Sequence, residues 1–243
     1  MSVKLGVVPA CLYMSNSPMM FLSNRGSFRP ETSGAYTLRR RGRRRPKSGS
    51  AIGARAVARL AGSGGPIGDY YGSANRRGID GVLIREAGTC QFMESASNVV
   101  IEGCTGTGKS YLACCLVKQA CRMRRGARYI RLPDLLMERD ELAATERSNA
   151  KILKKYARYE ILVLDEWLTE DVNDVDISFL FELIERRYAA KSTVLCTQYT
   201  PAEWHGRLGG GVQADSMVDR LIHGAVRIDL GDVNVRKLLA EKK

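Results

Sequence analysis

The sequence predicts an α/β protein in which a parallel β-sheet is flanked by helices. Short apolar runs alternate with amphipathic segments from about residue 79 onward, and strands that alternate with helices in this way form βαβ units. A glycine-rich turn follows the first apolar run and leads into a helical pattern. A later apolar run ends in two acids. Together these observations favour a sheet whose strand ends carry polar, chemically active residues.

The elements follow from the spacing of apolar residues. The stretch 79–93 has apolar residues at helical spacing and predicts one or two short helices, and 98–102 predicts a buried strand that ends at Gly103. We expect Trp204 and His205 in an extended loop, where they pack rather than catalyse. The remaining elements are expected as a helix over 110–125, a strand over 127–131, a helix over 133–144 entered through Pro133, a basic helix over 149–159, a strand over 160–164, a helix over 177–190, a strand over 192–197, a helix over 214–222 and a strand over 225–230.

Positive charge is concentrated in the first third of the chain. Residues 1–75 contain 12 Lys and Arg against Glu31 and Asp69, whereas residues 76–243 contain 26 against 24 acids. Residues 39–47 are almost continuously basic and are followed by Gly/Ser/Ala-rich sequence, with at most a short helix over 51–60. Low apolar content and like charge favour a flexible segment. We therefore predict a disordered basic segment over 1–75 and one folded domain over 76–243. Three interpretations of the segment stay open: a solvated tail, sequence upstream of the true start, or a nucleic-acid-binding arm.

Several classes of protein are disfavoured by composition. No apolar run reaches the roughly 18 residues of a membrane span, so no membrane association is expected. The first 22 residues are interrupted by polar residues and Pro, which is a poor signal peptide. The seven Cys are odd in number and none are spaced as CxxC, which argues against a disulfide framework or a structural zinc site. We expect a cytoplasmic protein with reduced cysteines.

The strongest motif is an eight-residue phosphate-binding loop. Residues 103–110 match G-x-x-x-x-G-K-[ST] in full, between a predicted strand and a predicted helix. Glycines permit the torsions that turn successive N–H groups toward phosphate oxygens, and the helix N-terminus favours the same anion. Lys109 supplies a charge to the β- and γ-phosphates, and the Ser110 hydroxyl ligates Mg²⁺. The predicted nucleotide-binding residues are Gly103, Cys104, Thr105, Gly106, Thr107, Gly108, Lys109, Ser110 and Tyr111.

A second motif ends the strand over 160–164. The apolar run is followed by Asp165 and Glu166, a Walker B pattern in which Asp165 holds Mg²⁺ and Glu166 is the general base for water. It follows the phosphate-binding loop by about 55 residues with one strand between them. We expect the two motifs on neighbouring strands. A strand followed by two acids is also a common solvated turn, so the interpretation depends on the pair of motifs.

Two further residues are candidates for catalysis. Gln198 follows the strand over 192–197 and can lie between the two motifs, where it would orient water or the γ-phosphate. Arg220 lies in the helix over 214–222 and can act as an arginine finger on a neighbouring subunit. The alternatives are a polar strand end for Gln198 and an ion pair with Asp215 or Asp219 for Arg220. Arg227 and Arg236 are weaker candidates for phosphate contact.

The stretch from about residue 77 to 237 resembles the IstB/DnaC-type ATP-binding proteins of the AAA+ class. The resemblance rests on residues 98–110, 128–136, 162–167, 192–198, 203–205 and 214–228. The run Asp219-Arg220-Leu221-Ile222-His223, followed by Arg227-Ile228, is particularly similar to the IstB pattern. IstB-like proteins usually carry a helical, basic N-terminal domain, and residues 1–75 show no such helices.

The resemblance implies a P-loop ATPase fold of the AAA+ type that uses ATP and Mg²⁺. It places Gln198 at the sensor-one position and Arg220 at the trans arginine finger. It also implies homo-oligomers on nucleotide and double-stranded DNA, with a transposase or a replicative helicase as partner. Two alternatives stay open at this point. One is a P-loop small-molecule kinase, and the other is a non-catalytic nucleic-acid-binding protein that works through its Arg-rich arm.

Overall fold

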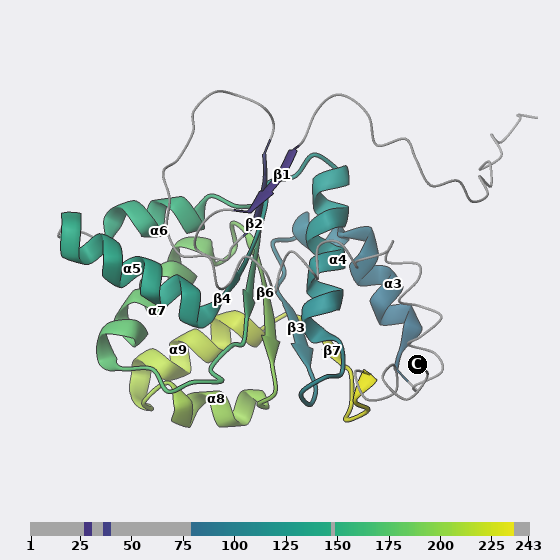
Figure 1. Cartoon of the computed structure of the whole chain (residues 1–243). Helices are drawn as coiled ribbons and strands as arrows, with labels where there is room; N and C mark the ends of the chain where they lie inside the picture. Colours follow the sequence, from purple (N-terminus) through teal and green to yellow (C-terminus); the bar gives the residue numbers. More distant parts are fainter. Residues whose placement is uncertain (1–26, 31–35, 40–78, 147–148, 236–243) are drawn as a thin grey trace, which may run out of the picture.

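The computed structural model describes residues 27–30, 36–39, 79–146 and 149–235, which form a seven-stranded sheet with helices on both faces (Figure 1). The strand order is β1-β2-β4-β5-β6-β3-β7. The five strands from β4 to β7 in that order are parallel, and β2 pairs antiparallel with both β1 and β4. The strands are β1 Ser27–Pro30, β2 Tyr36–Arg39, β3 Val99–Glu102, β4 Ala127–Arg131, β5 Ile161–Asp165, β6 Ser192–Thr197 and β7 Val226–Asp229.

The helices form two layers (Figure 1). Helices α3 and α4 cover one face of the sheet, and α5 to α9 cover the other. Each layer has its own apolar core against the sheet. The helices are α3 Gly81–Thr89, α4 Lys109–Arg122, α5 Leu132–Glu146, α6 Ala150–Ala157, α7 Asp174–Arg187, α8 Pro201–Arg207 and α9 Gly211–Ile222, with a 3₁₀ turn at Gln91–Met93.

The parallel strands are buried on both faces. Successive side chains of a strand point to opposite faces, so each strand supplies both cores. In β5, Ile161 and Val163 pack on the side of α4, whereas Leu162 and Leu164 pack on the side of α7. This double burial explains why the sequence shows continuous apolar runs rather than alternation, and the predicted α/β fold class is confirmed.

One helix of the structure is absent from the expectations. The prediction of an extended loop around Trp204 and His205 is wrong, because both lie in α8. The helix begins after Thr200, whose side chain and that of Glu203 form a capping box, and Pro201 occupies the first turn. Trp204 is fully buried, as expected of a packing residue.

Helix α7 begins three residues before the expected position. Asn173 accepts hydrogen bonds from the N–H groups of Val175 and Asp176, and the Asp176 carboxylate accepts one from the Asn173 N–H. This capping box supplies partners for N–H groups that the first turn leaves free. The polar residues before the apolar stripe therefore belong to the helix.

The expectation that neighbouring strands carry the two motifs is also wrong. Strand β6 lies between β3, which leads into the phosphate-binding loop, and β5, which carries Asp165. Strand β6 follows both β3 and β5 in the sequence but lies between them in the sheet, so the order of the strands along the chain does not give their order in space. A residue that follows β6 is consequently placed between the two motifs.

Most of the predicted N-terminal segment lies outside the described residues, including the expected short helix at 51–60. Two strands within 1–75 are described, and neither was predicted: β1 and β2 form a hairpin that adds to the sheet through β4. Tyr36 pairs with Tyr129 and Thr37 with Arg128. The disorder of this segment and the boundary near residue 76 stay predictions.

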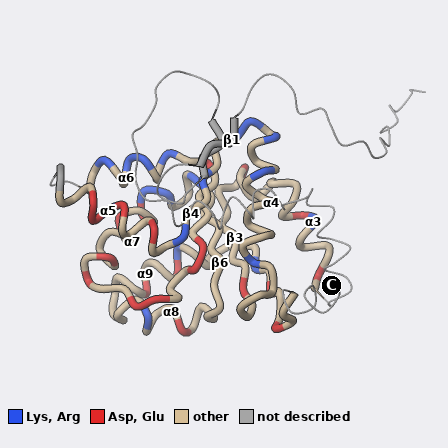
Figure 2. The backbone as a smooth tube through the Cα atoms, in the orientation of Figure 1, with Lys and Arg blue, Asp and Glu red and all other residues tan. Residues whose placement is uncertain are grey.

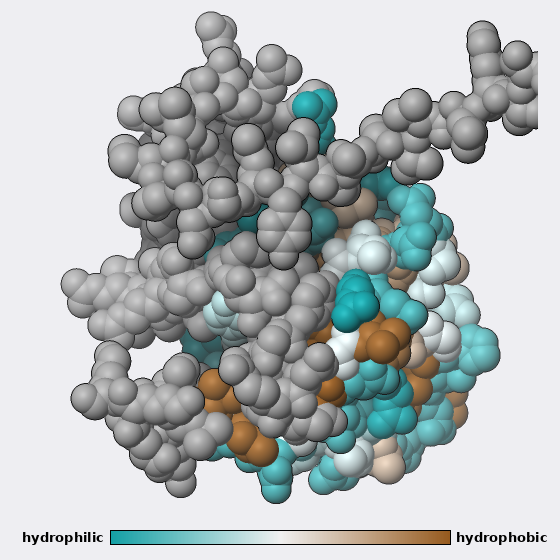
Figure 3. Space-filling view, turned by 90° about the vertical axis from the view of Figure 1, so that its right-hand side faces the viewer, coloured by the Kyte–Doolittle hydropathy of each residue, from teal (hydrophilic) through white to brown (hydrophobic). Residues whose placement is uncertain are grey.

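The described surface on the side of α3 and α4 is mostly hydrophilic, with small hydrophobic patches next to the part not described (Figure 3). Among the helices that the structure describes, none combines the length and the apolar character needed to cross a membrane.

Candidate nucleotide-binding site

The phosphate-binding loop joins β3 to α4 in a conformation that requires glycine. Gly103 and Gly106 have φ angles of 143° and 90°, which side chains other than glycine rarely adopt. A Cβ on Gly103 would lie 3.0 Å from the carbonyl oxygen of Gly231 and from Oγ1 of Thr107. A Cβ on Gly106 would lie 2.5 Å from Oδ1 of Asn234. Glycine is therefore required at these positions for two reasons: the backbone is left-handed, and neighbouring atoms leave no room for a Cβ.

Lys109 opens α4 and folds back over the loop. Its Nζ donates hydrogen bonds to the carbonyl oxygens of Gly103 at 2.7 Å and Cys104 at 2.9 Å. The buried hydroxyl of Thr107 also donates to the carbonyl oxygen of Cys104, at 2.9 Å. These bonds hold a cation directly at the loop, at the positive end of a helix of 14 residues. The arrangement suits an anion with several oxygens.

The two residues after Lys109 have different surroundings. Ser110 is partly exposed in the first turn of α4, where its hydroxyl stays available to a ligand. Tyr111 is half-buried and packs against the core between α4 and the sheet. The roles of Ser110 and Tyr111 in nucleotide binding stay predictions.

Asp165 ends β5 and is buried, with partners for both carboxylate oxygens. The Tyr129 hydroxyl donates a hydrogen bond to Oδ2, and the Glu166 N–H donates one to Oδ1 at 2.9 Å. Burial, together with the nearby Asp165 charge, raises the pKa of Tyr129 well above its ordinary value, so the phenol keeps its proton. These two hydrogen bonds fix the orientation of the Asp165 side chain at the end of its strand.

Glu166 follows Asp165 at a strained position and stays partly exposed. Its φ is 57°, and 42% of its side chain is accessible. Burial raises the pKa of its carboxyl, and the Arg131 guanidinium, with Nη1 3.5 Å from Oε2, opposes that rise. Arg131 is held in turn by Asp134, with Nε–Oδ2 at 3.0 Å and Nη2–Oδ1 at 2.6 Å. A carboxylate with a raised pKa at a strand end is suited to accept a proton.

The turn after Glu166 is held by the neighbouring strand and by α8. The Trp167 N–H donates to the carbonyl of Cys196 at 2.8 Å, and the Thr197 hydroxyl donates to the carbonyl of Trp167 at 3.2 Å. From α8, the Arg207 Nε donates to the carbonyl of Leu168 at 2.7 Å. Hydrogen bonds from β6 and from α8 therefore hold the strained backbone that follows β5 at Glu166.

Gln198 contacts the phosphate-binding loop. Thr105 Oγ1 donates a hydrogen bond to Gln198 Oε1 at 3.2 Å. Because β6 lies between β3 and β5, its carboxyl end brings Gln198 between the two motifs. The structure thus brings together, at one edge of the sheet, the loop at 103–110, Asp165, Glu166 and Gln198. What Gln198 does there stays a prediction.

Three contributors to this edge were missed in the sequence. Tyr129 and Arg131 lie on β4, and the register that pairs Arg131 with Asp165 brings both close to the acids. The segment after β7 lies over the loop: Gly231 accepts from the Cys104 N–H, and the Val235 N–H donates to the carbonyl of Gly106, both at 3.0 Å. The polar residues at the end of β4 could have indicated Tyr129 and Arg131, whereas no local pattern in the sequence indicates the segment after β7.

Arg220 lies apart from this edge in its own chain. Its Nη2 forms an ion pair with Glu185 on α7 at 2.8 Å, and the guanidinium lies over the rings of Phe181 and Tyr188. The ion-pair alternative is therefore present, with Glu185 as partner instead of the two aspartates considered. A contact with a neighbouring subunit stays a prediction. Arg227 pairs with Glu102, and Arg236 lies outside the described residues.

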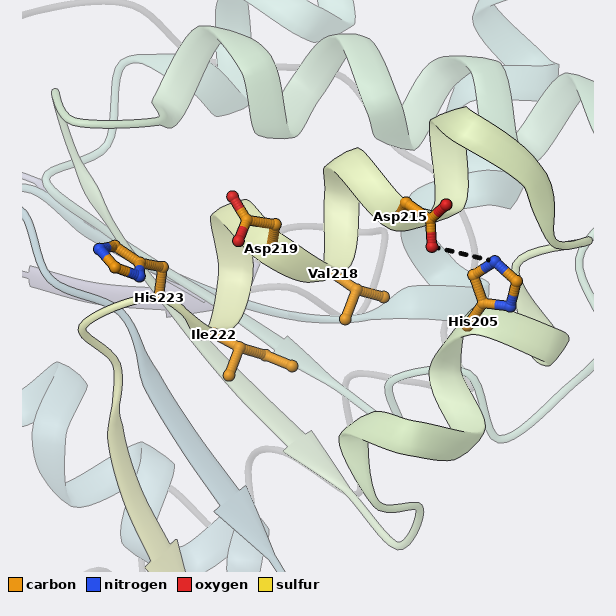
Figure 4. A pocket seen from close by; sticks show the side chains of 6 residues that line it. All are labelled: His205, Asp215, Val218, Asp219, Ile222 and His223. Atoms are coloured by element: carbon orange, nitrogen blue, oxygen red, sulfur yellow. Dashed lines mark ion pairs between the residues drawn. The ribbon is translucent and has the colours of Figure 1, made fainter.

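A hollow of about 370 Å³ between α8 and α9 holds none of the predicted site residues (Figure 4). His205 and Asp215 lie next to each other at one end of it, with Nε2 and Oδ1 3.1 Å apart. In the described part of the chain, no group of three or more His, Cys, Asp or Glu side chains is placed to hold a metal ion. The hollow is lined by His205, Asp215, Val218, Asp219, Ile222 and His223.

The model of the IstB-like ATP-binding protein family matches residues 68–242. This chain is a member of that family. Insertion sequence ATP-binding protein y4pL of Sinorhizobium fredii strain NBRC 101917 / NGR234 is 34% identical over 67% of this chain and 66% of its own length. Protein y4uH of the same strain is 36% identical over 60% of this chain and 59% of its own length. The chain thus spans less than two thirds of these relatives.

Solved structures show the same fold. The DnaC helicase loader has a TM-score of 0.52 and 23% identity, covering 61% of this chain and 87% of that one. A DNA replication initiation factor has a TM-score of 0.54 and 21% identity, covering 70% and 50%. The predicted membership of the IstB-like proteins and the AAA+ P-loop fold are confirmed. ATP binding is the common property in the names of the family and its relatives.

Proposed function

We propose that this IstB-like protein hydrolyses ATP with Mg²⁺ and assembles on double-stranded DNA, where it assists a transposase. One observation carries the ATPase part: the phosphate-binding loop, Asp165, Glu166 and Gln198 meet at the carboxyl edge of the sheet. Ligands of open α/β sheets bind at this edge. A P-loop with an acid pair and an amide nearby has the parts that phosphoryl transfer to water needs.

The loop and Lys109 would hold the triphosphate. The glycine torsions allow a loop whose N–H groups would face phosphate oxygens, and the Lys109 ammonium would turn from the carbonyls of Gly103 and Cys104 to those oxygens. Ser110 and Asp165 fit a magnesium site, because Mg²⁺ prefers hard oxygen ligands and often binds carboxylates through water. The ion supplies charge neutralisation at the β- and γ-phosphates.

Glu166 would accept the proton of the attacking water. Its partly buried carboxyl has a raised pKa, which makes it a stronger base. Arg131 limits this rise and keeps the carboxylate ionised. Gln198, in contact with Thr105, is placed to orient water or the γ-phosphate. Arg220 would complete the site of an adjacent subunit in an oligomer.

The partner is proposed from the relatives. Proteins y4pL and y4uH are named for insertion sequences, which favours a transposase over a replicative helicase as the partner. The DnaC neighbour keeps helicase loading as the alternative, although a likeness at 23% identity shows the fold alone. The strongly basic residues 39–47 supply charge suited to DNA phosphates.

The decisive test is ATP hydrolysis by the full chain, measured as phosphate release with and without duplex DNA. Glu166→Gln is expected to bind ATP normally and to lower kcat by about 10² to 10⁴, because an amide cannot take up the proton. Glu182→Gln, which removes an exposed acid from α7, is the matched control and should keep the parental rate. Parental turnover by Glu166→Gln would refute the general-base role.

The same assay separates the alternatives. A small-molecule kinase would release no phosphate to water and would need an acceptor. A protein that acts only through its basic arm would lose all DNA binding on deletion of residues 1–75, and ATP would never change its affinity for DNA. We expect ATP to strengthen DNA binding in the full chain, and this strengthening should be absent in Lys109→Ala.

A further inference from the structure

The edge of the sheet opposite the nucleotide site carries unpaired positive charge. Arg124 and Arg158 precede β4 and β5 by three residues, and Lys191 directly precedes β6. Arg122 and Lys154 lie in the last turns of α4 and α6, which end at the same edge. Figure 2 shows basic segments along α6 and at the end of α4 on this side of the molecule. We call these five side chains the amino-edge cations.

Backbone hydrogen bonds hold the three strand starts side by side. The Glu160 N–H donates to the carbonyl of Gly126 at 2.8 Å, and the Ser192 N–H donates to the carbonyl of Glu160 at 3.1 Å. Adjacent strands lie about 4.8 Å apart, so the starts of β4, β5 and β6 span about 10 Å. The cations that precede these strands therefore form one surface on a rigid support.

The amino-edge cations differ from the other described cations in their partners. Within the described residues, none of the five has a side-chain hydrogen bond or an ion pair, and their only ring contact is that of the Arg158 guanidinium over the Tyr159 ring, at 5.3 Å. Four of the five are exposed, and Lys191 is half-buried. Elsewhere, carboxylates hold the guanidinium groups of Arg131, Arg139, Arg186, Arg220 and Arg227.

The acids at this edge are already neutralised. Arg125 forms ion pairs with both Glu94 and Glu160, the latter at 2.9 Å. Among the residues that the structure describes, the amino-edge cations therefore have no carboxylate counterion, and an external anion would supply the missing charge.

We infer that the amino-edge cations bind the phosphate backbone of duplex DNA without reading its sequence. A duplex carries one charge per about 1.7 Å of its axis, so a surface of this width meets several phosphates at once. Exposed large apolar side chains near this edge are Met123 and Tyr188 among the described residues, and Tyr188 already lies under Arg220. Single-stranded nucleic acids need aromatic stacking and membranes need an apolar face, so a duplex fits better.

The position at which β2 ends, just before the basic run in the sequence, agrees with this assignment. Strand β2 runs antiparallel to β4, with Thr37 opposite Arg128, so it ends at Arg39 beside the start of β4. The sequence continues from there into the basic run that ends at Lys47. The proposed site consists of the five described cations, and the adjoining run adds charge of the same sign.

This inference rests on the proposed association with DNA, and its test is independent of ATP. Binding of a fluorescent, mixed-sequence duplex of about 30 base pairs is measured by anisotropy without nucleotide, between about 50 and 300 mM salt. For Arg124→Gln/Arg158→Gln in the full chain, we expect about tenfold weaker binding and a salt dependence whose log–log slope falls by about two. Arg85→Gln/Arg186→Gln removes the same charge from α3 and α7 and should bind like the parent.

Three results would overturn the inference. The first is an affinity and a salt slope for the duplex that stay parental in Arg124→Gln/Arg158→Gln. The second is an equal loss of duplex binding in the control pair. The third is that Arg124→Gln/Arg158→Gln loses binding to phosphatidylserine vesicles but not to the duplex, which would assign the surface to a membrane. ATP binding by the Arg124→Gln/Arg158→Gln variant, measured in parallel, should stay unchanged. A failure here would therefore leave the nucleotide site intact, whereas a failure of ATP hydrolysis in the parent would leave this surface untouched.

Discussion

The Tyr129 hydroxyl on β4 donates a hydrogen bond to Oδ2 of Asp165 at the end of the neighbouring strand. Both residues are buried, and the register of β4 and β5 brings them together. The bond leaves Asp165 one preferred orientation. If Asp165 holds Mg²⁺, then Tyr129 is a positioning residue for the metal, although it lies in neither motif.

Tyr129→Phe should weaken both folding and magnesium use. Loss of a hydrogen bond to a buried carboxylate should lower the free energy of unfolding by about 1.5–3 kcal/mol. It should also raise the Mg²⁺ concentration needed for half-maximal ATP hydrolysis. Tyr156→Phe is the matched control, because the Tyr156 hydroxyl donates to Glu138 at 2.6 Å in the other core. Equal magnesium requirements in the two variants would show that Tyr129 is only structural.

Arg131 and Asp134 should move the pH profile of hydrolysis in opposite directions. Glu166 must be ionised to act as a base, so the rate rises as pH increases through its pKa. Arg131 lowers that pKa and the Asp134 charge raises it. Arg131→Gln should therefore shift the acid limb of kcat to higher pH, and Asp134→Asn should shift it to lower pH. Shifts of the same sign would contradict the assigned contacts.

Lys109→Ala should abolish tight ATP binding. The ammonium group is held at the loop by two carbonyl oxygens. Removing a charge that faces buried phosphates should weaken binding by about 100-fold or more, as measured by titration with a fluorescent ATP analogue. Lys118→Ala, further along α4, should bind like the parent. Unchanged affinity in Lys109→Ala would exclude this loop as the nucleotide site.

The role of Arg220 can be separated from its ion pair. If Arg220 is a trans arginine finger, Arg220→Ala should lower hydrolysis in the assembled state by about 10³ or more. Glu185→Ala breaks the same ion pair but leaves the guanidinium in place, so it should keep most of the activity. Size-exclusion chromatography with ATP and duplex DNA checks that both variants still assemble. Equal losses in the two variants would leave Arg220 with an intrachain role alone.

Several features could be predicted from the sequence because they depend on neighbouring residues. The loop at 103–110 follows from its own glycines, its lysine and the helix behind it. Asp165 and Glu166 end a short apolar run that predicts a buried strand, and the helical spacing of Phe179, Leu180 and Leu183 predicts the face of α7 that packs against the sheet.

Other features could not be predicted, for distinct reasons. Helix α8 was missed because a capping box and Pro201 start it, whereas its apolar pattern is too short to show. The position of β6 was missed because crossover connections reorder strands. The contact of Asn234 with Gly106 joins residues far apart in the chain, and no local pattern records it.

The phosphate-binding loop and the acid pair on buried strands can be recognised from the order of residues alone, because a turn and the strand that enters it are specified by consecutive residues. The side chains that surround these two motifs depend on how the strands are arranged in the sheet. The order and register of the strands place Gln198 between the motifs, Tyr129 against Asp165 and Arg131 beside Glu166. They also place Arg124, Arg158 and Lys191 on one edge, because parallel strands bring together residues that are dozens of positions apart.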